Sequence, residues 1–235
     1  MKWSEFFTSS IGKKLVMGLT GLFLISFLVV HAGVNACIWA NDNGEMFNKA
    51  AHFMGSTVII RILEIGLFAG FFVHIIQGLA LEFQNRKKRG VAYQVSMGNT
   101  GSKWYSRSMG LLGTLILLFL ILHIYHFWTP SRLGGIAGIH ELQPVTYQDG
   151  REIHNLYAEM LTVFQDHILI VIIYVVGCLS LAWHLLHGFQ SAFRSIGLHN
   201  KKYLQLANSL GIIFSIIIPL VFAMMPVSIF LHWIE

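Results

Sequence analysis

The feature that most constrains this chain is a set of five long apolar segments. They cover residues 15–39, 57–82, 108–128, 166–189 and 206–233. About 20 apolar residues are enough to cross the hydrocarbon layer of a bilayer, so each segment is long enough to span it. Only 11% of the 235 residues are charged, whereas soluble domains average roughly a quarter. The sequence therefore predicts an all-α integral membrane bundle of five helices that forms a single domain over residues 1–235.

The first apolar segment has to be distinguished from a cleaved leader. Two lysines precede the apolar run 15–30, as the basic region of a signal peptide precedes its apolar region. This run is long for a signal peptide, and its apolar character continues towards residue 39. We therefore expect a retained membrane helix, capped by Ser9 or Ser10 and preceded by a short interfacial helix over residues 2–12.

Lysine and arginine are divided unequally between the two sets of connecting segments. One side holds Lys2, Lys13, Lys14, Arg86, Lys87, Lys88, Arg89, Lys103, Arg107, Arg194, Lys201 and Lys202. The other side holds Lys49, Arg61, Arg132 and Arg151. Because cytoplasmic loops are the basic ones, this distribution predicts a cytoplasmic N-terminus and an outer C-terminus in a bacterial cytoplasmic membrane. Basic residues interleaved with apolar runs are typical of membrane loops, so we expect no nucleic-acid partner.

The positions of the histidines along the predicted helices carry the functional argument. The chain has twelve histidines, and an ionisable residue inside a membrane helix is by default a functional hypothesis. His31 and His123 lie in the outer parts of the first and third helices, while His74 and His184 lie in the inner halves of the second and fourth. The two levels differ in height by roughly 15–20 Å at about 1.5 Å per residue. Two bis-histidine haems, one near each face of the membrane, would need this arrangement.

Two helices offer a choice of ligand. His123 and His126 are three residues apart, as are His184 and His187, so spacing alone does not select one member of either pair. Gly78 and Gly188 each follow a histidine by four residues and share its helix face, where a glycine would admit a flat macrocycle. Helix packing through small residues is the simpler explanation of each glycine, and a non-haem metal or proton relay is the alternative use of the histidines.

Several local motifs, taken in order, resemble one family. They are Ser-Ser-Ile-Gly-Lys-Lys at 9–14, His31-Ala-Gly-Val-Asn35, Glu45-Met-Phe-Asn-Lys49, His74-x-x-x-Gly78, His123-Ile-Tyr, Trp183-His184-x-x-x-Gly188 and Ser191-Ala-Phe-Arg194. The chain resembles the cytochrome b membrane anchor of type B succinate:quinone oxidoreductases, the succinate dehydrogenase and fumarate reductase family of the tricarboxylic acid cycle and anaerobic respiration. The resemblance covers nearly the whole chain.

The resemblance implies a specific set of cofactors and partners. It pairs His31 with His123 at an outer haem b and His74 with His184 at an inner haem b, and leaves propionate or packing roles for His126 and His187. It implies a partner flavoprotein with FAD, which carries the dicarboxylate chemistry, and a partner iron–sulfur subunit. Electrons would pass between the iron–sulfur clusters and a membrane quinone, with menaquinone expected.

Further site residues are expected at the two ends of the bundle. Lys103, Trp104 and Arg107 lie at the inner end of the third helix, where they would bind propionates of the inner haem or anchor the helix at the interface. Glu45 is our choice for quinone protonation.

The other candidates for the quinone site are Asn48, His52 and Glu64. The glutamate that a branch of the family has two residues before the fourth ligand is Ala182 here, so we expect no transmembrane proton pathway of that type.

Two other functions compete with this interpretation. One is the di-haem cytochrome b of another membrane oxidoreductase, of the hydrogenase or nitrate reductase type, which would keep the haem histidines without the Glu-Met-Phe-Asn context. The other is a transporter with a histidine proton relay, which would show broken helices or an internal repeat. A haem spectrum separates the transporter from both cytochromes.

Overall fold

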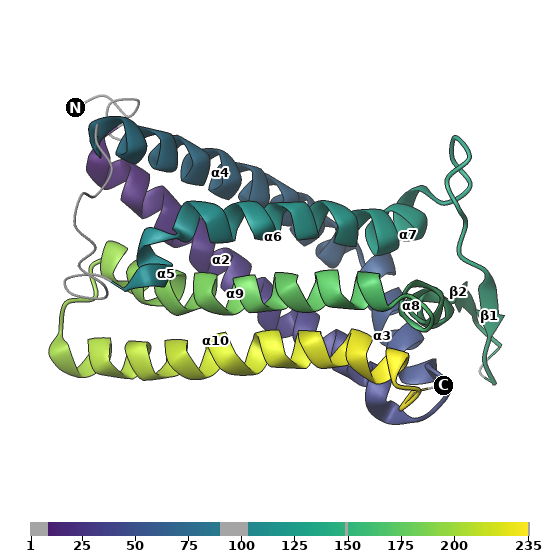
Figure 1. Ribbon diagram of the computed structural model, residues 1–235. Helices are drawn as coiled ribbons and strands as arrows, with labels where there is room; N and C mark the ends of the chain where they lie inside the picture. The colour runs from purple at the N-terminus through teal and green to yellow at the C-terminus, as the bar shows by residue number, and fades with distance from the viewer. Residues whose placement is uncertain (1–8, 90–102, 149, 235) are drawn as a thin grey trace. The chain divides into compact units, whose positions relative to one another are not determined.

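A computed structural model describes residues 9–89, 103–148 and 150–234, and the described part is mostly helical (Figure 1). The helix expected over residues 2–12 falls largely outside the described residues. The predicted cap is at Ser9, whose Oγ accepts a hydrogen bond from the Gly12 amide at 3.0 Å. The first described helix, α2, covers Ser10–Ala36 and continues into a short 3-10 helix, η1, at Cys37–Ala40.

Five helical spans are long and apolar enough to cross a membrane, which confirms the predicted number and is compatible with a multi-pass membrane protein. After α2 these are α4 (Val58–Arg89), α6 (Met109–His123) with its continuation, α9 (Ile168–Ser195) and α10 (Lys201–Phe230). The α6 helix continues through a π-helical turn, η2 (Ile124–Trp128), into α7 (Thr129–Leu133). Several spans run beyond the predicted ends, because polar residues such as Gln, Arg and Lys prolong a helix without adding to its apolar run.

Shorter elements connect the spans. They are α3 (Glu45–Ser56), α5 (Trp104–Arg107), β1 (Pro144–Thr146), β2 (Glu152–His154) and α8 (Leu156–Phe164). The strands β1 and β2 pair antiparallel, with Val145 opposite Ile153. The all-α prediction did not include this hairpin, which lies in the long segment that follows the third span.

The chain divides into two compact units, and each of the five spans contributes residues to both. Unit 1 comprises residues 1–28, 65–115 and 180–217, and unit 2 comprises residues 29–64, 116–179 and 218–235. All twelve basic residues expected on the cytoplasmic side fall in the ranges of unit 1, and all four expected outside fall in unit 2. The single-domain assignment stays a prediction.

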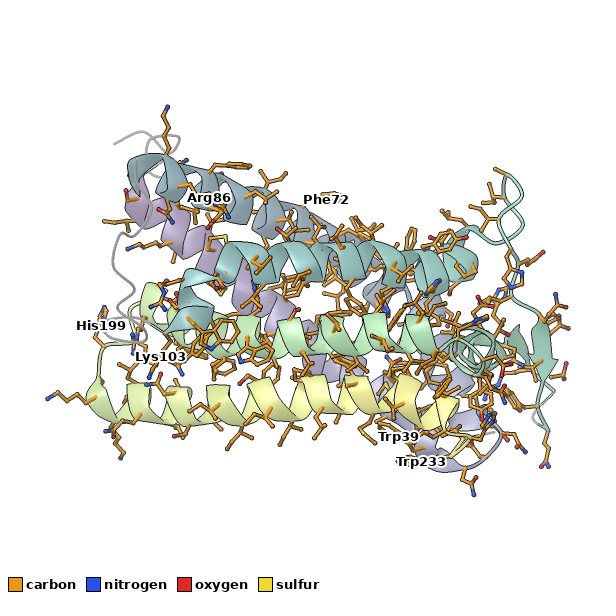
Figure 2. All side chains as sticks on the ribbon, viewed as in Figure 1. Trp39, Phe72, Arg86, Lys103, His199 and Trp233 are labelled. Atoms are coloured by element: carbon orange, nitrogen blue, oxygen red, sulfur yellow. The ribbon has the colours of Figure 1, made fainter. Side chains whose placement is uncertain are left out.

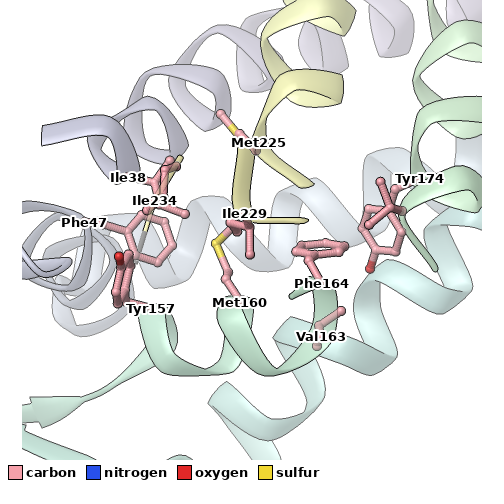
Figure 3. Packing of buried hydrophobic residues seen from close by; sticks show 11 residues of the cluster. Ile38, Phe47, Tyr157, Met160, Val163, Phe164, Tyr174, Met225, Ile229 and Ile234 are labelled. Carbon is pink, nitrogen blue, oxygen red and sulfur yellow. The ribbon is translucent and has the colours of Figure 1, made fainter. Parts of the chain in front are cut away.

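The core of unit 2 is a cluster of large apolar side chains around α8 and the end of α10 (Figure 3). Phe164 and Ile229 lie at its centre and are almost fully buried. Asn48 in α3 is also buried, and it donates to Tyr147 Oη and to Asn155 Oδ1, both at 2.9 Å. The side-chain carbonyl of Asn48 accepts from the Tyr157 amide at 2.9 Å, so one side chain ties α3 to the segment around β2 and α8.

Unit 1 packs through small residues and leaves apolar side chains on its surface. A Cβ added at Gly18 in α2 would lie 3.1 Å from Ser195 Cβ and 3.3 Å from the Ala192 carbonyl in α9, so glycine permits this close helix contact. On α4, Phe72 is 63% exposed (Figure 2). Exposed apolar residues of this kind, on a helix long enough to span, are the surface that lipid would cover.

Candidate functional site

In unit 2, His31 at the end of α2 meets His123 at the end of α6. Their imidazole centroids are 5.8 Å apart and the rings are nearly perpendicular, at 86°. Aromatic rings enclose this pair. Phe119 stacks on His123 at 5.6 Å, Tyr174 lies 6.1 Å from His123, and Phe222 lies 5.5 Å from His31. Two membrane helices thus present imidazoles to each other in an apolar surrounding.

In unit 1, His74 of α4 meets His184 of α9. The ring centroids are 6.3 Å apart with an interplanar angle of 64°. The sequence predicted that His31 would share a level with His123, and His74 with His184. In the structure each histidine contacts the predicted partner. Each pair draws its two rings from two different helices and lies within one unit.

The structure also separates the paired histidines from their neighbours three residues away. His126 does not share the position of His123, because its Nδ1 lies 2.9 Å from the Tyr174 hydroxyl and its ring stacks on that tyrosine at 5.9 Å and 9°. On α9 the ring in contact with His74 is that of His184. The choice of His123 and His184, which spacing left open, is therefore the one that the ring contacts favour.

The spacing of the paired rings fits two imidazoles bound to one metal. A metal–imidazole bond is about 2.0–2.1 Å long, and the nitrogen lies about 1.15 Å from its ring centroid, so two ligands on opposite sides of a metal have centroids about 6.3–6.5 Å apart. The 6.3 Å of the His74–His184 pair lies at the lower end of this range, and the 5.8 Å of the His31–His123 pair is 0.5 Å below it.

Two histidines are too few to hold a bare metal ion. Among the residues that the structure describes, no group of three or more His, Cys, Asp or Glu side chains is arranged to hold one. A haem brings four equatorial nitrogens of its own and asks the protein for two axial ligands. A pair of histidines therefore provides enough protein ligands for a haem but too few for a simple zinc or iron site.

A hydroxyl contacts the ring of His74. Thr20 Oγ1 in α2 lies 3.0 Å from His74 Nδ1, and it is also within hydrogen-bond distance of the Val16 carbonyl, at 2.8 Å. In the tautomer of His74 that carries its hydrogen on Nδ1, the Thr20 oxygen accepts this hydrogen while donating its own to Val16, and the lone pair on Nε2 is left for a metal. Metal-bound histidines commonly donate their second N–H in this way.

The other three rings have different surroundings. The amide nitrogen of Asn35 lies 3.3 Å from His31 Nδ1 and donates to the His31 carbonyl at 2.8 Å. The Nδ1 atoms of His123 and His184 are buried and have no hydrogen-bond partner among the described residues.

Glycines leave room beside the histidines. A Cβ added at Gly188, four residues after His184, would meet no heavy atom within 4 Å, and one at Gly78 would meet only Met17 Cε at 3.8 Å. A Cβ at Gly113 would come to 3.7 Å from the His184 ring. The helix contacts seen in the structure therefore do not require glycine at 78 or 188.

The predicted propionate residues lie in unit 1 with the His74–His184 pair. Trp104, at the start of α5, packs its ring 5.2 Å from that of Trp183, the residue before His184. Lys103 precedes α5 and Arg107 ends it, and both side chains are exposed. Lys103 and Arg107 thus flank Trp104, and Trp104 contacts Trp183, the residue before His184.

The residues predicted for a quinone lie in unit 2 but do not form one cluster. Glu45, in the first turn of α3, pairs with Lys49 at 2.6 Å, and its side chain is 37% exposed. Asn48 is committed to the buried hydrogen bonds that tie α3 in place. His52 is exposed and lines two adjacent pockets of ≈ 160 Å³ and ≈ 230 Å³. The larger pocket also contains Arg132, Ser131 and His154, and so combines donors with the apolar side chains of Leu142 and Leu156.

Glu64, in the first turns of α4, is the centre of a polar network. Its carboxylate accepts from Trp128 Nε1 at 2.6 Å, from Arg132 Nε at 3.2 Å and from Arg61 Nη1 at 2.8 Å. Arg132 also donates to the Gly55 carbonyl at 3.4 Å, which extends the network to the end of α3. Sequence reasoning named Glu64 but gave no such role to Trp128, the last residue of the third apolar run, or to Arg132, a cation four residues later.

No protein-family model, curated protein or solved structure matches the chain. Its function is therefore inferred from the motifs, the paired rings and the five spans.

Proposed function

We propose that this chain is the membrane anchor and electron-transfer subunit of a succinate:quinone oxidoreductase and binds two b haems. The observation that carries the proposal is the pairing of His31 with His123 and of His74 with His184 at ring separations of 5.8 and 6.3 Å. The resemblance of the ordered motifs to the anchors of that enzyme family selects this enzyme among those with di-haem cytochromes.

Each unit of the chain would supply one haem site. The bound haems would carry single electrons between an iron–sulfur partner and a quinone. The chain's own residues hold the axial histidines, exclude water with the aromatic rings around His123, and place the Thr20 hydroxyl beside His74 Nδ1. Lys103 and Arg107 are proposed to bind propionates in unit 1, where charge-assisted hydrogen bonds to carboxylates are strong.

The placement of basic residues supports an orientation. Unit 1 carries twelve of the sixteen lysines and arginines, which favours the cytoplasmic face of a bacterial membrane. The flavoprotein and the iron–sulfur subunit would then dock on the basic connecting segments, and the quinone is proposed to bind at the pockets around His52.

The pockets at His52 support a quinone site in unit 2. Small-molecule sites are concave and mostly apolar, with a few hydrogen-bonding groups that fix the ligand's orientation. The pocket of ≈ 230 Å³ is lined by His52 together with the apolar Ala51, Leu142 and Leu156, and His52 is proposed as the donor for a quinone carbonyl. Glu45 is proposed as the group that exchanges protons with the quinone.

A matched pair of variants on α9 tests the haem assignment. The complex would be purified from membranes, and haem b quantified per chain by reduced-minus-oxidised spectra and pyridine haemochrome. We expect two haems in the wild type, one in His184→Ala and two in the control His187→Ala. A wild type without haem would overturn the proposed function, and loss of haem in the control instead of His184→Ala would overturn the ligand assignment.

Partner composition separates this enzyme from other di-haem cytochromes. The anchor of a succinate:quinone oxidoreductase should co-purify with a flavoprotein carrying FAD and with an iron–sulfur protein, and the complex should reduce a quinone with succinate or oxidise a quinol with fumarate. Co-purification with a hydrogenase or nitrate reductase subunit would favour the other cytochrome type.

A further inference from the structure

The turn that follows His123 is wider than an ordinary helical turn. In η2 (Ile124–Trp128) the Thr129 amide donates to the Ile124 carbonyl five residues earlier, which is the hydrogen bond of a π-helix. Such turns are rare, occur mostly as single interruptions of an α-helix and are frequent at functional sites. A turn of this kind persists where its surroundings hold it.

Side-chain contacts hold this turn at three consecutive residues. His126 Nδ1 lies 2.9 Å from Tyr174 Oη of α9, and the two rings are stacked. Phe127 packs its ring 5.8 Å from Phe164 of α8. Trp128 Nε1 donates to Glu64 Oε1 of α4 at 2.6 Å. Three other helices of unit 2 therefore each hold one residue of the π turn.

The geometry of a helix links these contacts to the direction of His123. A π turn contains one residue more than an α turn, and each residue of an α-helix adds about 100° of rotation. If the turn closed to the α form, the residues after it would rotate by about this angle relative to His123. His126 and Trp128 lie within the turn and would rotate by part of this angle, so closing the turn would change the direction of His123 relative to Tyr174 and Glu64.

We propose that η2 is a positioning device for the His123 imidazole, held by the His126–Tyr174 and Trp128–Glu64 hydrogen bonds. His126 is then a positioning residue and not an alternative ligand. Tyr174 contributes twice, because it binds His126 and also lies 6.1 Å from the His123 ring. This inference rests on the proposed function, since it assigns to His123 the orientation that an axial ligand needs.

The test compares two tyrosine-to-phenylalanine variants of the whole complex. Tyr174→Phe removes the hydroxyl that binds His126 and keeps the ring. The control is Tyr125→Phe in the same π turn, where the side chain is 67% exposed. Low-spin haem signals in electron paramagnetic resonance spectra report the orientation of axial imidazoles, and haem content is measured in parallel. Trp128→Phe is a second variant, which removes the donor to Glu64 and keeps an aromatic ring.

We expect Tyr174→Phe to retain two haems and to shift one of the two low-spin signals, with the other unchanged. Trp128→Phe should shift the same signal, and Tyr125→Phe should shift neither. Unchanged signals in both Tyr174→Phe and Trp128→Phe would overturn the inference while the proposed function stood, as would equal shifts of both signals. A wild-type complex without haem would overturn the proposed function and the positioning role with it.

Discussion

The hydroxyl of Thr20 should set the reduction potential of one haem and leave the other unaffected. In Thr20→Val the side chain keeps its size and branching but loses the oxygen 3.0 Å from His74 Nδ1, which would accept the Nδ1 hydrogen when Nε2 is bound to a metal. A histidine that donates its second N–H is a more basic ligand, and a more basic ligand stabilises the ferric state. Removing the acceptor therefore raises the midpoint potential of the haem bound by His74 and His184.

The size of the shift follows from the free energy of one hydrogen bond. A hydrogen bond contributes about 0.5–1.5 kcal/mol, and only the part that differs between ferric and ferrous states changes the potential. For a one-electron couple a tenfold change in equilibrium constant, about 1.4 kcal/mol, corresponds to about 59 mV. The full value of the hydrogen bond thus sets an upper range of roughly 20–60 mV. A positive shift within or below this range is expected.

Redox titration of the purified complex, followed at the haem b α-band, resolves the two midpoint potentials. Thr20→Ser keeps a hydroxyl and should restore the wild-type value. The control Thr114→Val alters another threonine of unit 1, whose Oγ1 donates to the Gly110 carbonyl at 2.8 Å and whose side chain is exposed. A negative shift, no shift, or equal shifts of both haems in Thr20→Val would refute the reasoning.

Two further predictions concern glycines. Gly188→Leu should reduce the haem content from two per chain to one without loss of the folded chain, because its Cβ meets no heavy atom within 4 Å; Gly66→Leu on α4, where the same is true, should keep both haems. Gly44→Ala should lower the free energy of unfolding by about 2–4 kcal/mol in denaturation experiments, because Gly44 has φ +78° and a Cβ there would lie 2.2 Å from the Tyr157 ring. Gly138→Ala has a similar φ of +79° and open space, and should lower it by only about 1 kcal/mol.

The five spans and the two histidine pairs could be anticipated from the sequence because both depend on position along a helix. An apolar run long enough to span becomes a helix in a bilayer, and the rise per residue then fixes the depth of each histidine. Residues at the same depth on different helices can meet, and in the structure His31 meets His123 and His74 meets His184. Whether the pairs bind haem stays a prediction.

The polar supports of those pairs could not be anticipated, because they join residues that are distant in the sequence. Nothing near Thr20 indicates that its hydroxyl lies beside His74, 54 positions later. The π turn after His123 precedes Pro130, which lacks the amide hydrogen that an α-helix would donate to the His126 carbonyl, but a proline alone does not specify that the interruption takes the π form. The hairpin of β1 and β2 was missed because each strand has only three residues, too few to show an alternating pattern.

The structure separates the two carboxylates that the sequence offered for quinone protonation. Glu64 accepts hydrogen bonds from Trp128, Arg61 and Arg132, and its side chain is 17% exposed. Protonation of Glu64 would weaken its ion pairs with both arginines. Glu45 pairs with Lys49 and is 37% exposed. Lys49 lines the pocket of ≈ 160 Å³ that His52 also lines.

Glu45 is therefore the better candidate for exchanging a proton with a quinone, and Glu64 is the better candidate for a structural role. Glu45→Gln should lower quinone turnover while both haems and the thermal midpoint of the complex stay as in the wild type. Glu64→Gln leaves two guanidinium groups without their carboxylate, so it should lower the thermal midpoint. It should also shift the same low-spin haem signal as Trp128→Phe, because the hydrogen bond from Trp128 to Glu64 holds the π turn. Normal quinone turnover in Glu45→Gln, or selective loss of turnover in a thermally stable Glu64→Gln complex, would reverse the two assignments.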